Sequence, residues 1–241
     1  MFSNHKEPAS RKKYLIFFLF LAAFLFVFSQ TEPLMAQVPG ILGIPKTSAE
    51  FKMPKVGTYV KYKSTNEKTK TETILKLSVV GKEKLEKEEE FFWYEVEQTE
   101  PKTGGVTIIK MLISGDPRDL GTVKRMIFKS GKEPASELPQ AFVNLMNQTP
   151  PKDTTKAAEP KTKKLGTEKI ETKTGTFSCV HTQSTSPYNQ VTDNWTNAEV
   201  PMFGIVKSTS GSNTLVLLEH GTGAVTAIKE EPKLLEMPGQ K

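Results

Sequence analysis

The residues best suited to chemistry are Cys179 and His181, which lie two positions apart in a β-forming segment. Side chains two positions apart on a regular strand share a face, so the pair suggests a metal site or a nucleophile with its base. A structural zinc ion needs four protein ligands and a catalytic one needs three, and the other histidines, His5 and His220, are remote in sequence. Same-face neighbours on a strand stand about 7 Å apart, beyond hydrogen-bond reach of about 3 Å. We therefore expect a small buried thiol beside a polar strand residue, with no metal and no cofactor.

A second polar group could form where Asp193, Asn194 and Trp195 follow one another, with Glu199 nearby. The pattern favours a strand with an aromatic anchor over a binding pocket. The acidic run Glu88–Glu90 reads as a solvated turn. No nucleophile, base and orienting group can be assembled from these residues, so a non-enzymatic protein is expected and no catalytic residue is assigned.

The N-terminus contains the pattern of a secretory signal. Three basic residues, 11–13, precede the uninterrupted apolar run Leu15–Phe28, and a small residue, Ala36, stands before Gln37 as a cleavage point. The apolar run has 14 residues, whereas a membrane-spanning helix needs about 20. We predict a cleaved signal over 1–36 and an exported mature protein, the alternative being an uncleaved anchor in the inner membrane facing the periplasm.

Composition limits the remaining part to one exported domain. The formal charge is +6, of which residues 1–36 carry +2 (four basic, two acidic), so +4 remains on about 205 residues. Mixed charges of this kind do not form the basic stripe of a nucleic-acid binder, and nucleic acid is not an expected partner. The single cysteine excludes an internal disulfide, so stability must come from a hydrophobic core.

Proline, glycine and low-complexity segments divide the chain. Residues 37–54 form a Pro/Gly-rich lead-in, 55–231 a single domain and 232–241 a C-terminal tail. Within the domain, the Lys/Thr/Pro/Ala-rich stretch 149–164 is predicted to be a flexible loop, because it cannot bury apolar area.

Alternation of apolar and polar residues predicts about ten strands, mainly in antiparallel hairpins. The predicted segments are 56–63, 71–80, 91–98, 105–114, 122–129, 169–183, 189–196, 203–209, 214–220 and 224–229. Residues 81–90 are predicted to be a charged turn between the second and third of these strands; the alternative is a short helix, which the charge on both of its sides disfavours. The fold class is therefore mainly β with minor α.

One segment has a helical period. Leu138, Phe142, Leu145 and Met146 fall on one face of a helix that Pro150 ends. A short amphipathic helix over a curved antiparallel sheet could act as a lid on an apolar cavity, and Trp93 and Trp195 are candidate lining residues. The alternative is that the helix fills the core and no ligand binds.

The strand block Phe92–Glu95 and the block Val123–Lys129 resemble the LolA/LolB-like group of exported bacterial proteins. So does the stretch from Gly175 to Val200-Pro-Met-Phe-Gly-Ile-Val-Lys207, and together the likeness covers residues 56–230 loosely. The resemblance implies a strongly curved antiparallel sheet, a half-barrel of about eleven strands, in the periplasm. It also implies handling of acyl chains or lipoproteins. This chain departs from the true carriers in having one convincing lid helix and the insertion at 149–164.

The leading hypothesis is a periplasmic protein that binds a lipid, an acyl chain or a lipoprotein in the concave face of its sheet. Phe142, Leu145 and Met146 would then form the lid, and contact with the membrane would be transient. The alternative is an envelope structural or interaction protein that docks a protein partner and holds no small ligand.

Overall fold

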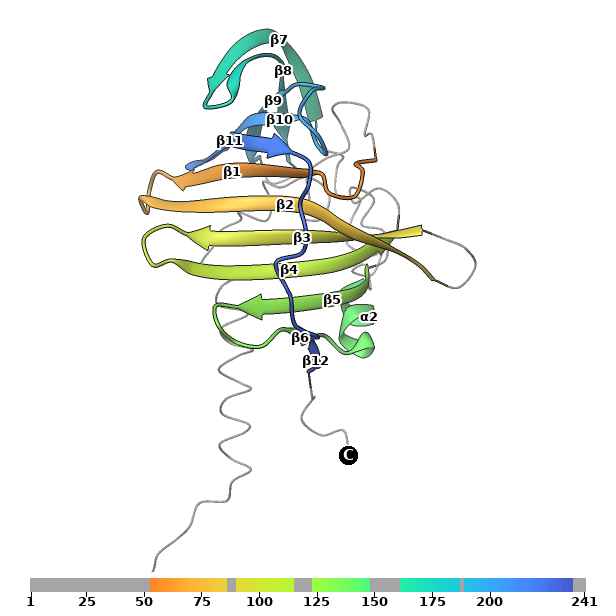
Figure 1. Cartoon of the computed structure of the whole chain (residues 1–241). Coiled ribbons are helices and arrows are strands. Elements are labelled where there is room, and N and C mark those ends of the chain that lie inside the picture. Colours follow the sequence, from red (N-terminus) through yellow and green to blue (C-terminus); the bar gives the residue numbers. More distant parts are fainter. Residues whose placement is uncertain (1–52, 86–89, 115–122, 148–160, 187–188, 236–241) are drawn as a thin grey trace, which may run out of the picture.

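The computed structural model describes residues 53–85, 90–114, 123–147, 161–186 and 189–235 (Figure 1). The predicted signal, its cleavage point at Ala36 and Gln37, and nearly all of the lead-in lie outside these ranges. Within the described ranges, no helix combines the length and the apolar character needed to cross a bilayer.

The described residues form one large, open, curved sheet of twelve strands with one short helix (Figure 1). The predicted mainly β fold is confirmed, with twelve strands in place of the expected ten to eleven. The spatial order is β12-β6-β5-β4-β3-β2-β1-β11-β10-β9-β8-β7. All neighbours are antiparallel except β12 and β6, which are parallel. The elements are β1 (Tyr59–Asn66), β2 (Thr71–Lys84), β3 (Glu90–Glu100), β4 (Gly105–Ser114), β5 (Val123–Ser130), β6 (Ser136–Glu137), α2 (Gln140–Asn147), β7 (Lys161–Thr172), β8 (Gly175–Thr185), β9 (Val191–Thr196), β10 (Ile205–Ser210), β11 (Asn213–Gly221) and β12 (Lys233–Leu234).

Two runs of hairpins make up the sheet, and one strand pair joins them. Strands β1 to β6 follow one another in space as in sequence, and so do β7 to β11. The two runs meet where β1 pairs with β11, with Tyr62 opposite Leu217 and Asn66 opposite Asn213. This long-range pairing makes a single sheet out of the two halves of the chain.

Alternation along each strand gives the sheet two different faces. In β1, Val60 and Tyr62 are buried while Lys61 and Lys63 are only partly so. Val60 and Tyr62 belong to a large apolar cluster that also contains Val143 of helix α2, and we call this side of the sheet the helix face. A second, smaller cluster lies on the opposite side of β3–β5 and contains Ile228.

The chain after β11 crosses the sheet instead of adding a strand to it (Figure 1). We call residues 222–235 the strap. The strand predicted over 224–229 is therefore wrong: Val225 is exposed, Ile228 is buried, and the segment has no strand pairing. The predicted tail from residue 232 is also partly ordered, because Lys233–Leu234 forms β12. Alternation over six residues does not distinguish a strand from an extended chain that lies across other strands.

Two predicted connections are shorter than expected. Lys161–Lys164 was predicted to be part of a flexible loop, but these residues begin β7 and pair with Thr182–Thr185. The remaining loop residues, 149–160, lie outside the described ranges. The predicted turn over 81–90 also contracts, since Lys82, Glu83 and Lys84 pair with β3. Backbone pairing with a neighbouring strand outweighs the weak β-propensity of lysine and glutamate at these positions.

The turn before β10 offers a test of local backbone strain. Gly204 has a φ of +70°, and a Cβ there would lie 3.0 Å from the carbonyl oxygen of Asn197. Gly211 has a φ of +55°, and a Cβ there would have no neighbour within 4 Å. Both alanine variants incur the left-handed penalty of about 1–2 kcal/mol, and only Gly204→Ala adds a backbone clash.

We expect Gly204→Ala to lower the free energy of unfolding by at least about 1 kcal/mol more than Gly211→Ala, because of that clash. Urea denaturation of the two variants measures the difference. Equal losses would mean that the turn relaxes around the added methyl group.

Candidate functional site

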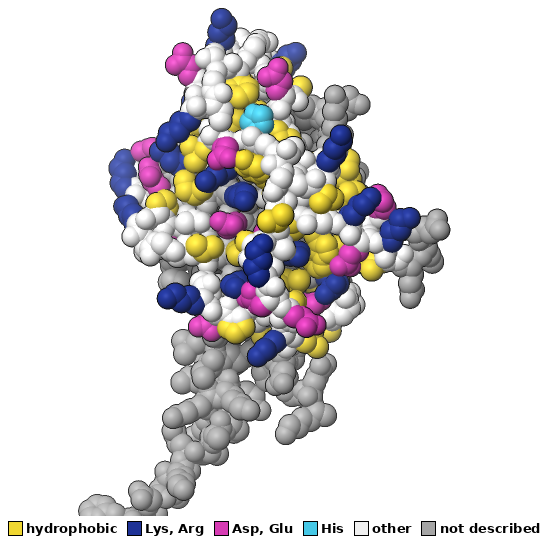
Figure 2. Space-filling model, viewed as in Figure 1, with side chains coloured by type: hydrophobic (Ala, Val, Ile, Leu, Met, Phe, Trp, Pro, Cys, Tyr) yellow, Lys and Arg dark blue, Asp and Glu magenta, His cyan; other side chains and the backbone are white. Residues whose placement is uncertain are grey.

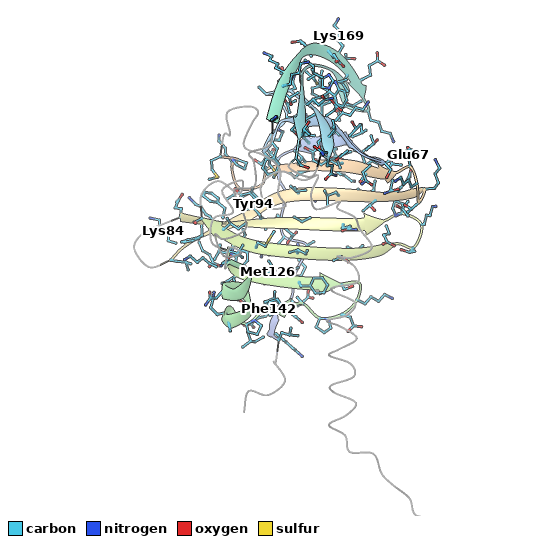
Figure 3. The ribbon with its side chains drawn as sticks, turned by 180° about the vertical axis from the view of Figure 1, so that it is seen from behind. Glu67, Lys84, Tyr94, Met126, Phe142 and Lys169 are labelled. Carbon is cyan, nitrogen blue, oxygen red and sulfur yellow. The ribbon has the colours of Figure 1, made fainter. Side chains whose placement is uncertain are left out.

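The helix face is apolar over the N-terminal half of the sheet. Figure 3 shows it from behind, with Tyr94, Met126 and Phe142 labelled along it. The buried side chains on β1 to β5 that share the cluster with α2 are Val60, Tyr62, Leu75, Leu77, Val79, Tyr94, Val96, Met111, Ile113 and Met126. Burial raises the pKa of Tyr62, whose hydroxyl donates to the carbonyl oxygen of Ile205 at 3.2 Å. The phenol therefore stays neutral, and this face presents no charge at that point.

Over the C-terminal half, the same face carries buried polar side chains beside the apolar Leu215 and Leu217 of β11. Thr182 on β8 lies opposite Asn194 on β9, which lies opposite Ser208 on β10. Ser208 and Ser64 of β1 both lie opposite Leu215 of β11. Ser64 alternates with Val60 and Tyr62, so it faces the helix side of the sheet. We call Thr182, Asn194, Ser208 and Ser64 the polar row; all four are buried.

Helix α2 is fastened to β5 at both ends. The Leu138 N–H donates to the Met126 carbonyl oxygen at 2.9 Å, just before the helix begins. At its other end, the Asn147 amide donates to the Val123 carbonyl oxygen at 2.8 Å and accepts from the Val123 N–H at 3.2 Å. The Asn147 side-chain amide thus makes the two hydrogen bonds with the Val123 backbone that a neighbouring strand would otherwise make. These bonds hold the helix as a fixed cover of β5.

The apolar side of α2 differs from the predicted stripe. Val143 is buried at 1% exposure and joins the main cluster, with Leu138 packed beside it. Phe142, predicted as a central lid residue, is only half-buried. The side chains of Leu145 and Met146 lie outside the described part of the structure. A helix of eight residues that Pro139 precedes is set by its anchors on β5, and these turn Val143 toward the sheet.

Trp93 does not line a cavity with the helix. Side chains alternate along β3, so Tyr94 faces the helix cluster and Trp93 falls in the second cluster on the opposite face. There the Trp93 indole N–H donates to Glu83 at 2.8 Å. Lys110 and Arg125 lie over its ring, at 4.8 and 5.2 Å from the centroid. Trp93 is therefore a structural cation–π residue, and its proposed role in the cavity is corrected.

The two cations beside Trp93 are held differently. Arg125 makes two hydrogen bonds to Glu137, at 2.7 and 2.9 Å, and these raise its pKa. Partial burial lowers the pKa of Lys110. The paired arginine ties β5 to β6, which stabilises the short strand at this edge of the sheet.

Glu95 of β3 fixes the strap to the side of the sheet that carries the second apolar cluster. Its carboxylate is 3% exposed, and it accepts hydrogen bonds from the Thr226 hydroxyl at 2.6 Å and from the Ala227 N–H at 2.9 Å. Farther along, Lys129 pairs with Glu230, which also accepts from the Ala135 N–H at 3.2 Å. These polar contacts place Ile228 over the second apolar cluster. The strap thus covers part of the second cluster, and Figure 2 shows Lys, Arg, Asp and Glu side chains scattered among apolar ones on this side of the molecule.

His181 lies between two carboxylates on neighbouring strands. Its Nδ1 is 2.7 Å from Glu168 of β7 and its Nε2 is 2.9 Å from Asp193 of β9. Trp195 stacks on the imidazole with centroids 4.3 Å apart, and its indole N–H donates to Glu168 at 2.8 Å. Lys207 lies over the Trp195 ring at 4.8 Å. The group fastens the edge strand β7 across β8 to β9.

In this arrangement both nitrogens of His181 are engaged by carboxylates, so neither is directed at open space. Cys179 is fully buried, its Sγ points at the Phe177 carbonyl oxygen at 3.7 Å, and burial raises the pKa of its thiol. Among the described residues, no three metal-ligating side chains are grouped to hold an ion. Trp195 borders the main apolar cluster, but its ring and N–H are occupied by this polar group.

Sequence reasoning identified Cys179, His181, Asp193 and Trp195 but missed their partner Glu168. That residue lies one position before the predicted strand, in a stretch with no apolar alternation. It also missed the Glu95–Thr226 contact, whose members are 131 residues apart. No local sequence signal links the two. The first omission is local: the predicted strand over 169–183 is in fact the end of β7, a turn and β8, and Glu168 is 13 residues from His181 across that hairpin. Only the second omission depends on long-range strand placement, which one sequence does not encode as a pattern.

Comparisons with known proteins add no family to this geometry. No protein-family model matches the chain, and no curated protein matches it. The LolA/LolB-like assignment is therefore not confirmed.

Two solved structures are similar at low identity. One, from Bacteroides fragilis, is described as a "putative exported protein with YmcC-like fold"; it is 14% identical, with a TM-score of 0.36, and the match covers 73% of this chain and 100% of that one. The other, from Parabacteroides distasonis, is described as a "putative lipoprotein"; it is 14% identical, with a TM-score of 0.35 and the same coverage.

The contribution of the strap to stability can be tested at the Thr226–Glu95 hydrogen bond. Thr226→Val keeps the shape of the side chain but leaves a buried carboxylate oxygen without its donor. We expect a loss of about 1–3 kcal/mol in the free energy of unfolding, with faster hydrogen exchange at the Ala227 amide. Thr222→Val, at an exposed position of the strap, is the control and should change neither quantity. Unchanged exchange at Ala227 would show that the strap does not depend on Glu95.

The Glu168 carboxylate predicts an acid-dependent contribution to stability. Hydrogen bonds from Trp195 and His181 lower its pKa from 4.5. A carboxyl group with a depressed folded pKa stabilises the fold above its unfolded pKa, and the effect is lost as pH falls through the folded pKa. Trp195→Phe should therefore raise the Glu168 pKa toward 4.5. The stability difference from wild type should be full near neutrality and shrink below about 4.5.

Carboxyl chemical shifts during an NMR titration measure this change. Glu230 is the internal control, because Lys129 lowers its pKa to about 2 independently of Trp195. A Glu168 pKa that does not move in Trp195→Phe would exclude the indole as its main stabilising donor.

Proposed function

We propose that the protein is an exported, non-enzymatic protein of the cell envelope that binds an acyl chain of a lipid or lipoprotein on the helix face of its sheet. The observation that carries the proposal is the mismatch between that face and its cover. Apolar side chains extend over β1 to β5, while α2, the only helix in the described ranges, packs on β5.

The dimensions make the mismatch concrete. Neighbouring strands are about 4.8 Å apart and a helix with its side chains is about 10 Å across, so α2 can cover about two strands. The apolar side chains of β1, β2 and β3 lie beyond the reach of α2; they are buried and share their cluster with Val200, Met202 and Phe203, which precede β10. The proposed acyl chain would insert beside these side chains, at about 0.8 kcal/mol for each buried methylene. Met111 and Met126 suit a flexible ligand, because methionine adapts its shape to its neighbours.

Export and the absence of catalysis belong to the same proposal. The basic and apolar order of residues 11–28 supports secretion, and with it a location in the periplasm. Both nitrogens of His181 are engaged and Cys179 is buried, and this argues against hydrolytic chemistry at the cluster that these two residues form with their neighbours.

Matched substitutions on the two faces test the proposal. Phe92 is half-buried against the main cluster, and Val106 is half-buried against the second cluster on the next strand. We expect Phe92→Ser to weaken binding of monoolein at least tenfold, because it removes about 1.5–3 kcal/mol of apolar contact. Val106→Ser should leave binding unchanged, since that side chain lies on the strap side.

The measurement is mass spectrometry under native conditions of the exported protein isolated without detergent, before and after addition of monoolein. Thermal unfolding of each variant checks that the fold is retained. A wild-type protein that carries no acylated species and takes up no monoolein would refute the proposal. It would favour a filled core and an envelope protein that docks a protein partner.

A further inference from the structure

Positive charge is concentrated on strand β7 and the turn that follows it. Residues 161–173 contain five lysines and two glutamates, a formal charge of +3. Residues 37–241 together carry +4, so this one segment accounts for most of the net charge outside the predicted signal. We call residues 161–173 the basic edge. Its lysines, all exposed, are Lys161, Lys163, Lys164, Lys169 and Lys173.

Many lysines elsewhere in the sheet are engaged by a neighbouring side chain, whereas those of the basic edge are not. The lysines in ion pairs are Lys63, Lys70, Lys82 and Lys129, and those that lie over an aromatic ring are Lys76, Lys110, Lys124 and Lys207. Within the described ranges, none of the five lysines of the basic edge has an ion pair or a side-chain hydrogen bond. Their charge is therefore available to a partner.

The basic edge is accessible because β7 is the last strand of the sheet. It pairs with β8 on one side and arches over the end of the sheet (Figure 1), and Figure 3 shows Lys169 at its crest, far from Phe142 of α2. Lys163 lies opposite Gln183 and Lys164 opposite Thr182, so the two lysines point to different sides of the strand. A surface that approaches this edge meets lysines on both sides of it.

An exposed leucine interrupts the lysines. The register between β7 and β8 shifts between Lys164 and Gly166, so Leu165 is the extra residue of a β-bulge, and it is 42% exposed. A bulge changes the direction of a side chain, and here it leaves an apolar one in solvent beside two lysines. The surface of a bilayer accepts leucine and lysine side by side, because its acyl boundary lies just below its headgroups. This combination favours a lipid surface over an acidic protein as the partner.

We infer that the basic edge docks the protein on an anionic lipid surface, with the lysines at the headgroup phosphates and Leu165 at the acyl boundary. The choice of a bilayer rests on the proposed function, since a protein that binds acyl chains must exchange them with a membrane. Each lysine close to an anionic surface strengthens binding about fivefold. The lysines also discourage pairing with a foreign strand, and the two roles are compatible because a bilayer offers no backbone partner.

Sedimentation of the exported protein with lipid vesicles tests the inference. One set of vesicles contains equal amounts of phosphatidylglycerol and phosphatidylcholine, and the other contains phosphatidylcholine alone. We expect wild type to bind the anionic vesicles and to remain in solution with the neutral ones. Sodium chloride at about 1 M, where charges are screened beyond about 3 Å, should release the bound protein.

Two triple variants separate the basic edge from net charge. Replacement of Lys161, Lys163 and Lys164 by glutamine should lower the partition onto anionic vesicles at least about tenfold. The matched control removes the same charge from exposed lysines in three turns between strands, and should leave the partition nearly unchanged; it replaces Lys68, Lys102 and Lys132 by glutamine. Equal losses in the two variants would overturn the inference, because the attraction would then depend on net charge alone.

Leu165→Ser tests the apolar part of the contact. We expect the partition onto anionic vesicles to fall about fivefold, the effect of half-burying one leucine. Val225→Ser, at a position of the strap that is 67% exposed, is the control and should change nothing. Thermal unfolding checks that each variant keeps the fold. An unchanged partition in Leu165→Ser would contradict contact of this side chain with the acyl boundary.

Uptake of monoolein, measured on the same preparation, distinguishes failure of the docking surface from failure of the acyl site. If wild type takes up monoolein but ignores anionic vesicles, acyl binding stands and the docking surface is refuted; the lysines then only protect the edge. If wild type binds the vesicles as inferred and takes up no monoolein, docking stands and the proposed acyl site is wrong. Equal binding to anionic and neutral vesicles would also overturn the docking surface, since its lysines would then have no role in it.

Discussion

The pairing of β1 with β11 is the constraint on which the rest of the fold depends. It joins the hairpins of the N-terminal half to those of the C-terminal half and closes a loop of about 150 residues, from Asn66 to Asn213. The backbone hydrogen bonds of this ladder, which is interrupted by one register shift between Lys61 and Tyr62, and the buried Tyr62, Leu215 and Leu217 along it offset the entropy of that closure. Because the first and last long strands meet, the helix face brings apolar strands beside polar ones.

An open sheet of this width has two apolar faces that other segments must cover, and in the described part of the chain short segments contribute to both covers. A two-turn helix and an irregular strap bury little area, so each is fixed by side-chain hydrogen bonds: Asn147 fixes α2 to β5, and Glu95 fixes the strap to β3. The strap covers its apolar cluster with Ile228, whereas α2 covers one end of a larger face. The difference in cover is what separates a structural face from a candidate binding face.

The sequence predicts elements where alternation is strong and fails where placement decides the structure. Leu75, Leu77 and Val79 indicate a strand and its buried side. Neighbouring Trp93 and Tyr94 are both plausible cavity residues, because alternation assigns them to opposite faces without saying which face lies under the helix. Lys161–Lys164 carry no apolar alternation that would indicate a strand. They form one nevertheless, because an edge strand can be held by backbone pairing with its neighbour alone. Glu95 and the strap are found only when the sheet has been assembled.

Both free edges of the sheet are protected against pairing with a second copy of the chain. β12 has only two residues, and β7 has exposed lysines at Lys161, Lys163 and Lys164, so neither edge favours such pairing. Polar contacts hold β7, with Glu168 bonded to His181 and Trp195, and Ile170 of the same strand packs against the main apolar cluster. An edge strand that combines charged outer side chains with one apolar contact and one buried polar group is held to its own sheet and does not attract a foreign strand.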